Sequence, residues 1–260
     1  GMYTTALLHP SCALSTSTPP DYENVRLTTS SGITLPGWWR PPANGAVILL
    51  LGGHGANRDA MLPVAKILAN HGYGVLTLSY RHCAGAAATL GYREVEELQA
   101  MAAFAASQPG VNWMGALGYS VGGVTVIRGA AGMPELKAVI AEGNYANLYD
   151  EFTAEPAVPL SLQWQVQRLV ALFYMLQTGI WPGQVNPLGD LARLSPRPVL
   201  LIHGQYEIER TRGLAQATAA GPGGELWIVP DAGHGQYLTT HPQEYERRVI
   251  AFFEHSRGKQ

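Results

Sequence analysis

Short apolar runs alternate with helix-like stretches along most of this 260-residue chain. The runs span residues 46–51, 73–80, 113–119, 136–142, 198–203 and 225–230. Runs of this length that are apolar throughout are typical of strands buried on both faces of a sheet. Parallel strands joined through helices follow right-handed crossovers, so the alternation predicts an α/β domain with a mainly parallel, doubly wound sheet.

Two segments depart from this alternation. Residues 22–28 and 33–40 flank a "TSSG" turn and predict an antiparallel hairpin near the N-terminus. Residues 143–192 contain no apolar strand run but include an apolar-rich helical stretch, so we expect a lid inserted into the domain. The sequence thus predicts one domain over residues 21–258, preceded by a flexible lead-in over residues 1–20, in which Gly1 is interpreted as a cloning remnant.

Composition excludes several classes of protein. Hydrophobic residues make up 47% of the chain and charged residues 14%, which is enough for a sizeable core. The net charge of −2 gives no basic stripe for a nucleic acid, and no segment has the length of a membrane span. The two cysteines, Cys12 and Cys83, are too few for a disulfide framework or a zinc site, so we expect free thiols and a cytoplasmic protein.

Ser120 lies in the sequence Gly118-Tyr119-Ser120-Val121-Gly122, directly between a predicted strand and a predicted helix. A nucleophilic serine needs a tight turn here that lifts its hydroxyl above the sheet edge. Glycines two residues before and after it allow the strand and the helix to approach closely. The pattern therefore predicts a nucleophile at Ser120, although the same residues also suit a simple packing turn.

Further polar side chains follow other predicted strands, and carboxyl ends of parallel strands share one edge of the sheet. Glu207 follows the 198–203 run and is the expected acid, with Glu209 and Glu142 as alternatives. His234 follows the 225–230 run in a glycine-flanked loop and is the expected general base.

An oxyanion hole requires two backbone N–H groups beside the nucleophile. We expect these donors to be Val121, which follows Ser120, and Ala56, in the "GGHGANRD" loop after the 46–51 run. His54 in this loop precedes the serine, so we interpret it as structural and not as the base.

The order serine, acid, histidine, together with "LGGHGANRD", "GYSVGG", "PRPVLLIHG" and "ELWIVPDAGHG", resembles the α/β-hydrolases. Within that superfamily the chain is similar to bacterial serine hydrolases of the dienelactone-hydrolase, acyl-CoA-thioesterase and peptidase-like kind. The resemblance implies the α/β-hydrolase fold, hydrolysis through an acyl-enzyme, and no cofactor or metal.

The sequence predicts a serine hydrolase that cleaves a small or medium acyl ester, with Trp164, Phe173 and Trp181 of the lid as candidate pocket residues. A thioesterase or an aminopeptidase-like hydrolase would use the same three residues. A non-catalytic binding protein with this fold is the alternative of another class. The sequence leaves open whether the protein is a monomer or a homodimer.

Overall fold

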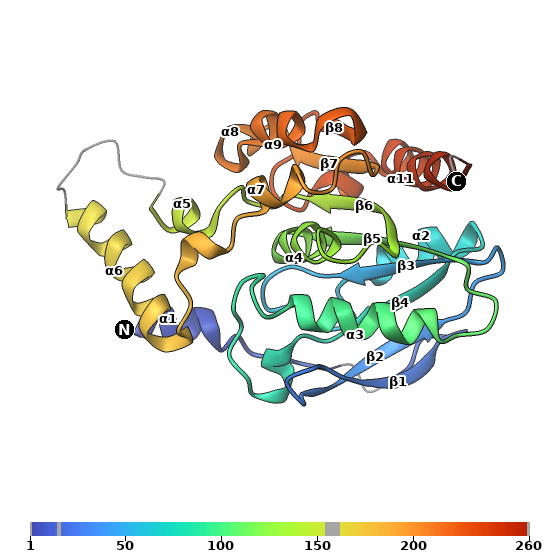
Figure 1. The fold of residues 1–260 in the computed structure, drawn as a ribbon, viewed down its shortest axis with the longest axis horizontal. Helices are drawn as coiled ribbons and strands as arrows, with labels where there is room; N and C mark the ends of the chain where they lie inside the picture. Colours follow the sequence, from blue (N-terminus) through green and yellow to red (C-terminus); the bar gives the residue numbers. More distant parts are fainter. Residues whose placement is uncertain (1, 15–16, 154–161, 259–260) are drawn as a thin grey trace.

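The computed structural model describes residues 2–14, 17–153 and 162–258. Its centre is an eight-stranded sheet in the order β1-β2-β4-β3-β5-β6-β7-β8, which confirms the predicted α/β fold class (Figure 1). The strands are β1 (Glu23–Thr28), β2 (Thr34–Arg40), β3 (Ala46–Leu51), β4 (Gly74–Leu78), β5 (Trp113–Tyr119), β6 (Leu136–Glu142), β7 (Val199–Gly204) and β8 (Gly224–Val229). β1 and β2 form the expected antiparallel hairpin, and the strands from β3 to β8 are parallel.

Helices cover both faces of the sheet because its central strands are apolar on both sides. On one face lie α3 (Val95–Ala106), α4 (Val121–Ala130) and α9 (Gly213–Ala220); on the other lie α2 (Leu62–Asn70) and α11 (Pro242–Gly258) (Figure 1). All six residues of β3 are buried, as expected for a strand between two helical layers. The short α8 (Ile208–Thr211) and α10 (Tyr237–Thr240) follow β7 and β8.

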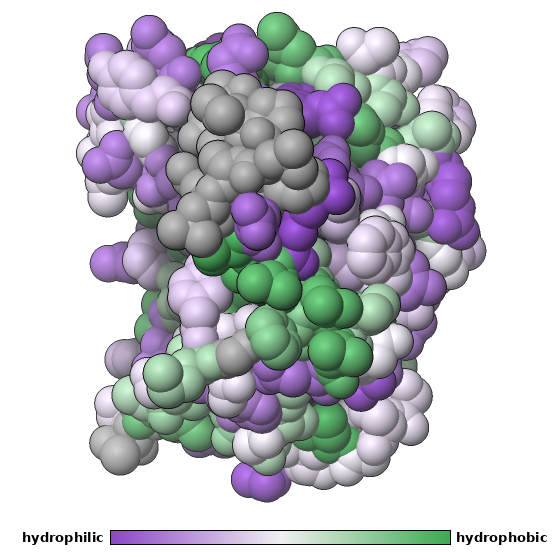
Figure 2. All heavy atoms as spheres, turned by 90° about the vertical axis from the view of Figure 1, so that its left-hand side faces the viewer, coloured by the Kyte–Doolittle hydropathy of each residue, from purple (hydrophilic) through white to green (hydrophobic). Residues whose placement is uncertain are grey.

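The segment between β6 and β7 folds as helices, and one part of it, residues 154–161, lies outside the described residues. The elements are α5 (Leu148–Thr153), α6 (Leu162–Thr178), the 3₁₀ turn η2 (Pro182–Gln184) and α7 (Pro187–Leu191). The inner face of α6 buries Tyr174, whose hydroxyl donates a 2.8 Å hydrogen bond to the carbonyl of Thr89. The outer face of α6 carries exposed apolar side chains, and Figure 2 shows this face of the molecule. No helix in the described part of the chain has the length and hydrophobicity that crossing a bilayer requires.

The N-terminal segment forms an element that the sequence did not predict. Residues Met2–Leu8 form α1, which packs against α6 at one end of the molecule (Figure 1). Leu8 is buried in a cluster that also contains Val121 and Tyr174. This part of the chain is therefore attached to the domain, whereas we expected a mobile lead-in over residues 1–20.

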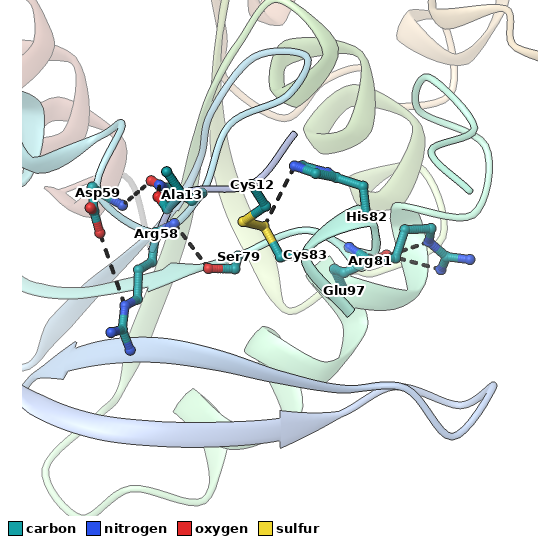
Figure 3. The surroundings of a disulfide bond; sticks show 10 residues. Cys12, Ala13, Arg58, Asp59, Ser79, Arg81, His82, Cys83 and Glu97 are labelled. Atoms are coloured by element: carbon teal, nitrogen blue, oxygen red, sulfur yellow. Dashed lines mark hydrogen bonds and ion pairs between the residues drawn. A yellow bond between two sulfur atoms is a disulfide. The ribbon is translucent and has the colours of Figure 1, made fainter. Parts of the chain in front are cut away.

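The prediction of two free thiols is wrong. The Sγ atoms of Cys12 and Cys83 form a disulfide, although 71 residues separate them in the sequence. Cys83 lies in the 3₁₀ turn η1 (Arg81–Ala84) directly after β4, and the N-terminal segment folds back across this turn (Figure 3). Because disulfides persist mainly in oxidising compartments, the cysteines no longer support the expected reducing, cytoplasmic environment.

Candidate active site

Ser120 lies on a strained turn between β5 and α4. Its backbone has φ +54° and ψ −116°, a conformation that L-residues rarely adopt. The flanking glycines leave no room for a side chain. A Cβ on Gly118 would lie 2.2 Å from the carbonyl oxygen of Gly122, and a Cβ on Gly122 would lie 2.2 Å from that of Leu51. The two glycines therefore allow β5, α4 and β3 to meet at the serine.

Three side chains from three strand ends form a continuous hydrogen-bonded chain. Nε2 of His234 lies 3.2 Å from Oγ of Ser120, and Nδ1 of the same ring lies 2.7 Å from Oε2 of Glu207. The loops after β5, β7 and β8 supply one residue each, as the sequence pattern predicts. This arrangement can remove a proton from the serine hydroxyl and stabilise the resulting imidazolium.

Glu207 is buried, with 6% of its surface exposed, and its carboxylate has three hydrogen-bond donors. The N–H of Gly204 donates to Oε1 at 2.9 Å, the hydroxyl of Tyr237 also donates to Oε1, and His234 contacts Oε2. Burial raises the pKa of Glu207, but the hydrogen bonds from His234, Tyr237 and Gly204 outweigh it, and the pKa lies below its ordinary value. The carboxylate is therefore charged at neutral pH.

Within the described residues, neither alternative acid forms a hydrogen bond or an ion pair with His234. Glu209 is exposed on α8. Glu142 is buried at the end of β6 and accepts a 2.5 Å hydrogen bond from the hydroxyl of Tyr245. Burial raises the pKa of Glu142 to about 7, and the hydrogen bond from Tyr245 lowers it only in part. Among these three carboxylates, Glu207 alone is hydrogen-bonded to the histidine.

The imidazole of His234 is held by aromatic neighbours that sequence reasoning missed. Its ring lies 5.0 Å from the ring of Tyr119, centroid to centroid, at an interplanar angle of 38°. Tyr237, which donates to Glu207, also packs against Tyr119. The His234 side chain nevertheless keeps 41% of its surface exposed. Tyr119 occupies a variable position of the Gly-x-Ser-x-Gly pattern, so that pattern alone gives no signal of its role.

The loop after β3 differs from the prediction at Ala56. The N–H of Ala56 donates a 3.1 Å hydrogen bond to the carbonyl of Gly53, which closes a turn with Gly55 at φ +72°. This N–H is therefore already used within the turn. Within the described residues, the N–H groups of His54 and of Val121 make no hydrogen bond. Burial lowers the pKa of the His54 ring, which favours its neutral form.

The predicted pocket residues Phe173 and Trp181 are both exposed to solvent. The side chain of Trp164 lies outside the described residues. Phe173 is 37% exposed on the outer face of α6, and Trp181 is 46% exposed and stacks on Tyr149 with ring centroids 5.0 Å apart.

A cavity of about 370 Å³ instead adjoins His234. Its walls come from the start of α2, the ends of β5 and β6, α10 and α11. They include Met61, Pro63, Val64, Leu238, Tyr119 and Glu142.

One group of side chains in the described residues could hold a metal ion. Ligand atoms of Cys12, His82 and Cys83 all lie within 4.8 Å of one another. Both sulfurs, however, are joined in the disulfide, and metal binding requires thiolates. The group therefore does not fit a metal site in this state.

Comparison with known proteins shows similarity at the level of structure. No protein-family model matches the sequence, and no curated protein matches it significantly. An esterase of Pyrococcus furiosus superposes with a TM-score of 0.75 at 24% identity, covering 95% of this chain and 99% of the esterase. The α/β hydrolase GrgF from Penicillium sp. superposes with a TM-score of 0.71 at 20% identity, covering 92% and 99%. Est1E from Butyrivibrio proteoclasticus superposes with a TM-score of 0.67 at 17% identity, covering 90% and 99%. The chain therefore has the α/β-hydrolase fold.

Proposed function

We propose that the protein is a serine hydrolase that cleaves a small or medium acyl ester through an acyl-enzyme. The observation that carries this proposal is the hydrogen-bonded chain from Ser120 through His234 to Glu207. The similarity in fold to an esterase and to an α/β hydrolase supports the same class of reaction.

The reaction begins with the serine hydroxyl. Nε2 of His234 takes the proton of Ser120 as Oγ attacks the carbonyl carbon of the substrate, and Nδ1–H of His234 donates to Glu207. His234 then gives this proton to the leaving alcohol, which leaves an acyl group on Ser120. A water molecule, deprotonated by His234, attacks the acyl-enzyme and releases the acid.

The negative oxygen of the tetrahedral intermediate needs backbone donors. Val121 is the first residue of α4, where the positive end of the helix dipole adds to the effect of its N–H group. We assign the second donor to the N–H of His54, because the N–H of Ala56 is committed to the carbonyl of Gly53. This assignment replaces Ala56 by a residue of the same loop.

The cavity beside His234 suits one part of the substrate. Its volume of about 370 Å³ and its apolar wall of Met61, Val64 and Leu238 favour a short apolar group over a long chain. His234 is one of the residues that line this cavity. We therefore infer that the cavity accepts a small apolar part of the ester.

A fluorophosphonate probe tests the nucleophile directly. We expect the folded wild-type protein to be labelled and the Ser120→Ala variant to remain unlabelled. His234→Ala should also lose labelling, whereas the control His241→Ala should be labelled like the wild type. A folded wild-type protein that the probe does not label would favour the alternative, a non-catalytic binding protein with this fold.

A matched set of substrates then separates the enzyme classes. Esters, thioesters and aminoacyl anilides with the same short acyl chains distinguish an esterase from a thioesterase or an aminopeptidase-like hydrolase. We expect the highest kcat/KM on the esters, with activity declining as the acyl chain outgrows the cavity. Faster turnover of thioesters or anilides would move the assignment to the corresponding class.

A further inference from the structure

The segment from Leu8 to Ala13 runs between the lid and the loop that carries the proposed oxyanion donor. At its start, Leu8 is 1% exposed and packs in the cluster that contains Val121 and Tyr174. The carbonyl of Leu8 accepts a 2.7 Å hydrogen bond from the N–H of Ala88. One end of the segment is therefore fixed to the core beneath the lid.

The middle of the segment contacts the loop formed by residues 53–57. Pro10 lies against Gly55, because a Cβ placed on Gly55 would be 3.4 Å from Cβ of Pro10. The side-chain amide of Asn57 donates a hydrogen bond to the carbonyl of Ala13. The segment thus contacts this loop at Gly55 and at Asn57, on either side of Ala56. Gly55 directly follows His54, whose N–H is the proposed oxyanion donor.

The disulfide fastens the far end of the segment to a rigid part of the fold. Cys83 lies in η1, beside Arg81, whose guanidinium donates to the buried carboxylate of Glu97 at 2.8 and 3.1 Å. Nε2 of the neighbouring His82 lies 3.5 Å from Sγ of Cys83 (Figure 3). The disulfide therefore joins Cys12 to η1, while Pro10, two residues before Cys12, lies against Gly55.

Both cysteines are only partly buried, so a small reductant can reach the bond. Ser11 and Ala13 flank Cys12. Within the described residues the backbone of residues 9–13 makes two hydrogen bonds: the N–H of His9 donates to the carbonyl of Thr5, and the carbonyl of Ala13 accepts from the side-chain amide of Asn57. Among the described residues, no backbone hydrogen bond joins residues 10–13 to a helix or a strand, so the disulfide is the main attachment of this part of the segment.

We propose that the Cys12–Cys83 disulfide is a redox-controlled clasp that positions the oxyanion loop for acyl transfer, an inference that rests on the proposed function. A dithiol supplies two electrons and two protons: the S–S bond breaks, two thiols form, and the dithiol becomes a cyclic disulfide. Pro10 and Ala13 then leave the loop, and the N–H of His54 loses its fixed position. Since misplaced catalytic groups slow reactions strongly, we expect kcat to fall about tenfold or more.

The test compares one protein in two redox states, with a chelator present so that the freed thiols bind no metal. We measure kcat and KM of oxidised and dithiol-treated wild type on one short ester, and the rate of fluorophosphonate labelling. The reduced protein should show the lower kcat with KM changed less, and reoxidation should restore it. The Cys12→Ser/Cys83→Ser variant should match the reduced wild type and should not respond to the dithiol.

A second variant keeps the test independent of any loss of folding on reduction. Pro10→Gly retains the disulfide but removes the ring that lies on Gly55, so its kcat should fall about threefold or more with the fold intact. Equal kcat in both redox states, or cysteines that are free in the air-oxidised protein, would overturn the clasp. If the oxidised wild type is not labelled at all, the proposed function fails first, which is a different result from labelling that reduction leaves unchanged.

Discussion

The hydroxyl of Tyr237 donates a hydrogen bond to Oε1 of Glu207. This contact occupies the oxygen that does not face the histidine, so it fixes the rotation of the carboxylate and leaves Oε2 for Nδ1 of His234. Both Tyr237 and Glu207 are buried, and hydrogen bonds to buried charged groups are stronger than neutral ones. Tyr237 therefore acts as a positioning residue in the proposed mechanism.

Tyr237→Phe removes this donor and preserves the ring. We expect kcat to fall about tenfold with little change in KM, and the free energy of unfolding to fall by about 1–3 kcal/mol, because the carboxylate loses one of its partners. The control is Tyr206→Phe, which removes a hydroxyl from a residue that is 70% exposed. A kcat that is equal in the two variants would mean that Tyr237 does not position Glu207.

Glu207→Gln tests the acid of the triad. The amide can still contact His234 but carries no charge to stabilise an imidazolium, so we expect kcat/KM to fall by about 10²–10⁴. Glu209→Gln makes the same change two residues away on the exposed α8 and should stay within about twofold of the wild type. Steady-state measurements of kcat/KM on one ester compare the two variants. A large loss of kcat/KM in Glu209→Gln would mean that Glu209, and not Glu207, is the acid of the triad.

Glu142 should make stability depend on pH. Its folded-state pKa of about 7 lies above the ordinary value of 4.5 that it regains on unfolding, so between these values the folded protein holds a proton that the unfolded chain has lost. Its contribution to stability is therefore lost as pH rises through this window. Glu142→Gln should gain about 2–3 kcal/mol relative to the wild type between pH 4.5 and 7.5.

Urea unfolding at the two pH values measures this difference. The control is Glu135→Gln, which alters an exposed carboxylate and should change stability by less than about 0.5 kcal/mol. A difference between Glu142→Gln and the wild type that is the same at both pH values would show that folding does not raise the pKa of Glu142.

Gly118→Ala tests the close approach of β5 and α4. The added Cβ would lie 2.2 Å from a backbone oxygen that cannot move without displacing the helix, so we expect a loss of at least about 3 kcal/mol of stability or no folded protein. Gly132→Ala is the matched control, because its nearest neighbour would be 3.8 Å away. Thermal unfolding of the two variants makes the comparison, and similar melting temperatures would contradict the steric argument.

Leu8→Ala tests whether α1 belongs to the domain. Leu8 is 1% exposed, and its removal from a packed cluster should cost about 2–4 kcal/mol. Leu14→Ala truncates a leucine that is 41% exposed and should change stability by less than about 0.5 kcal/mol. A stability unchanged by Leu8→Ala would mean that the N-terminal segment contributes nothing to the fold in solution.

The parts of the site that depend on local geometry could be predicted from the sequence. The glycines around Ser120 are required by the short distance between β5 and α4, and the residues after β7 and β8 must emerge at the same edge of the sheet. The choice between Glu207 and its alternatives depended on which carboxylate contacts His234. Side-chain contacts of this kind are tertiary, and no spacing in the sequence specifies them.

The wrong or incomplete predictions concern long-range or backbone contacts. The bond between Cys12 and Cys83 depends on the path of an irregular N-terminal segment, which has no hydrophobic periodicity to indicate its partner. The N–H of Ala56 was assigned from the loop motif, but the positive φ of Gly55 closes a turn that uses this group. The lid residues Phe173 and Trp181 are apolar in the sequence, yet they lie on faces that point to solvent.

The position of α1 beside α6 has a practical consequence for attaching the protein to other molecules. The N-terminal end of the described chain lies next to α6, whereas α11 ends at the opposite end of the molecule (Figure 1). A fusion partner, a purification tag or an immobilising resin joined before α1 would lie beside α6 and its exposed apolar side chains. The same attachment after α11 would leave α1 and α6 facing the medium, so the C-terminal side is the place to couple this protein to a surface.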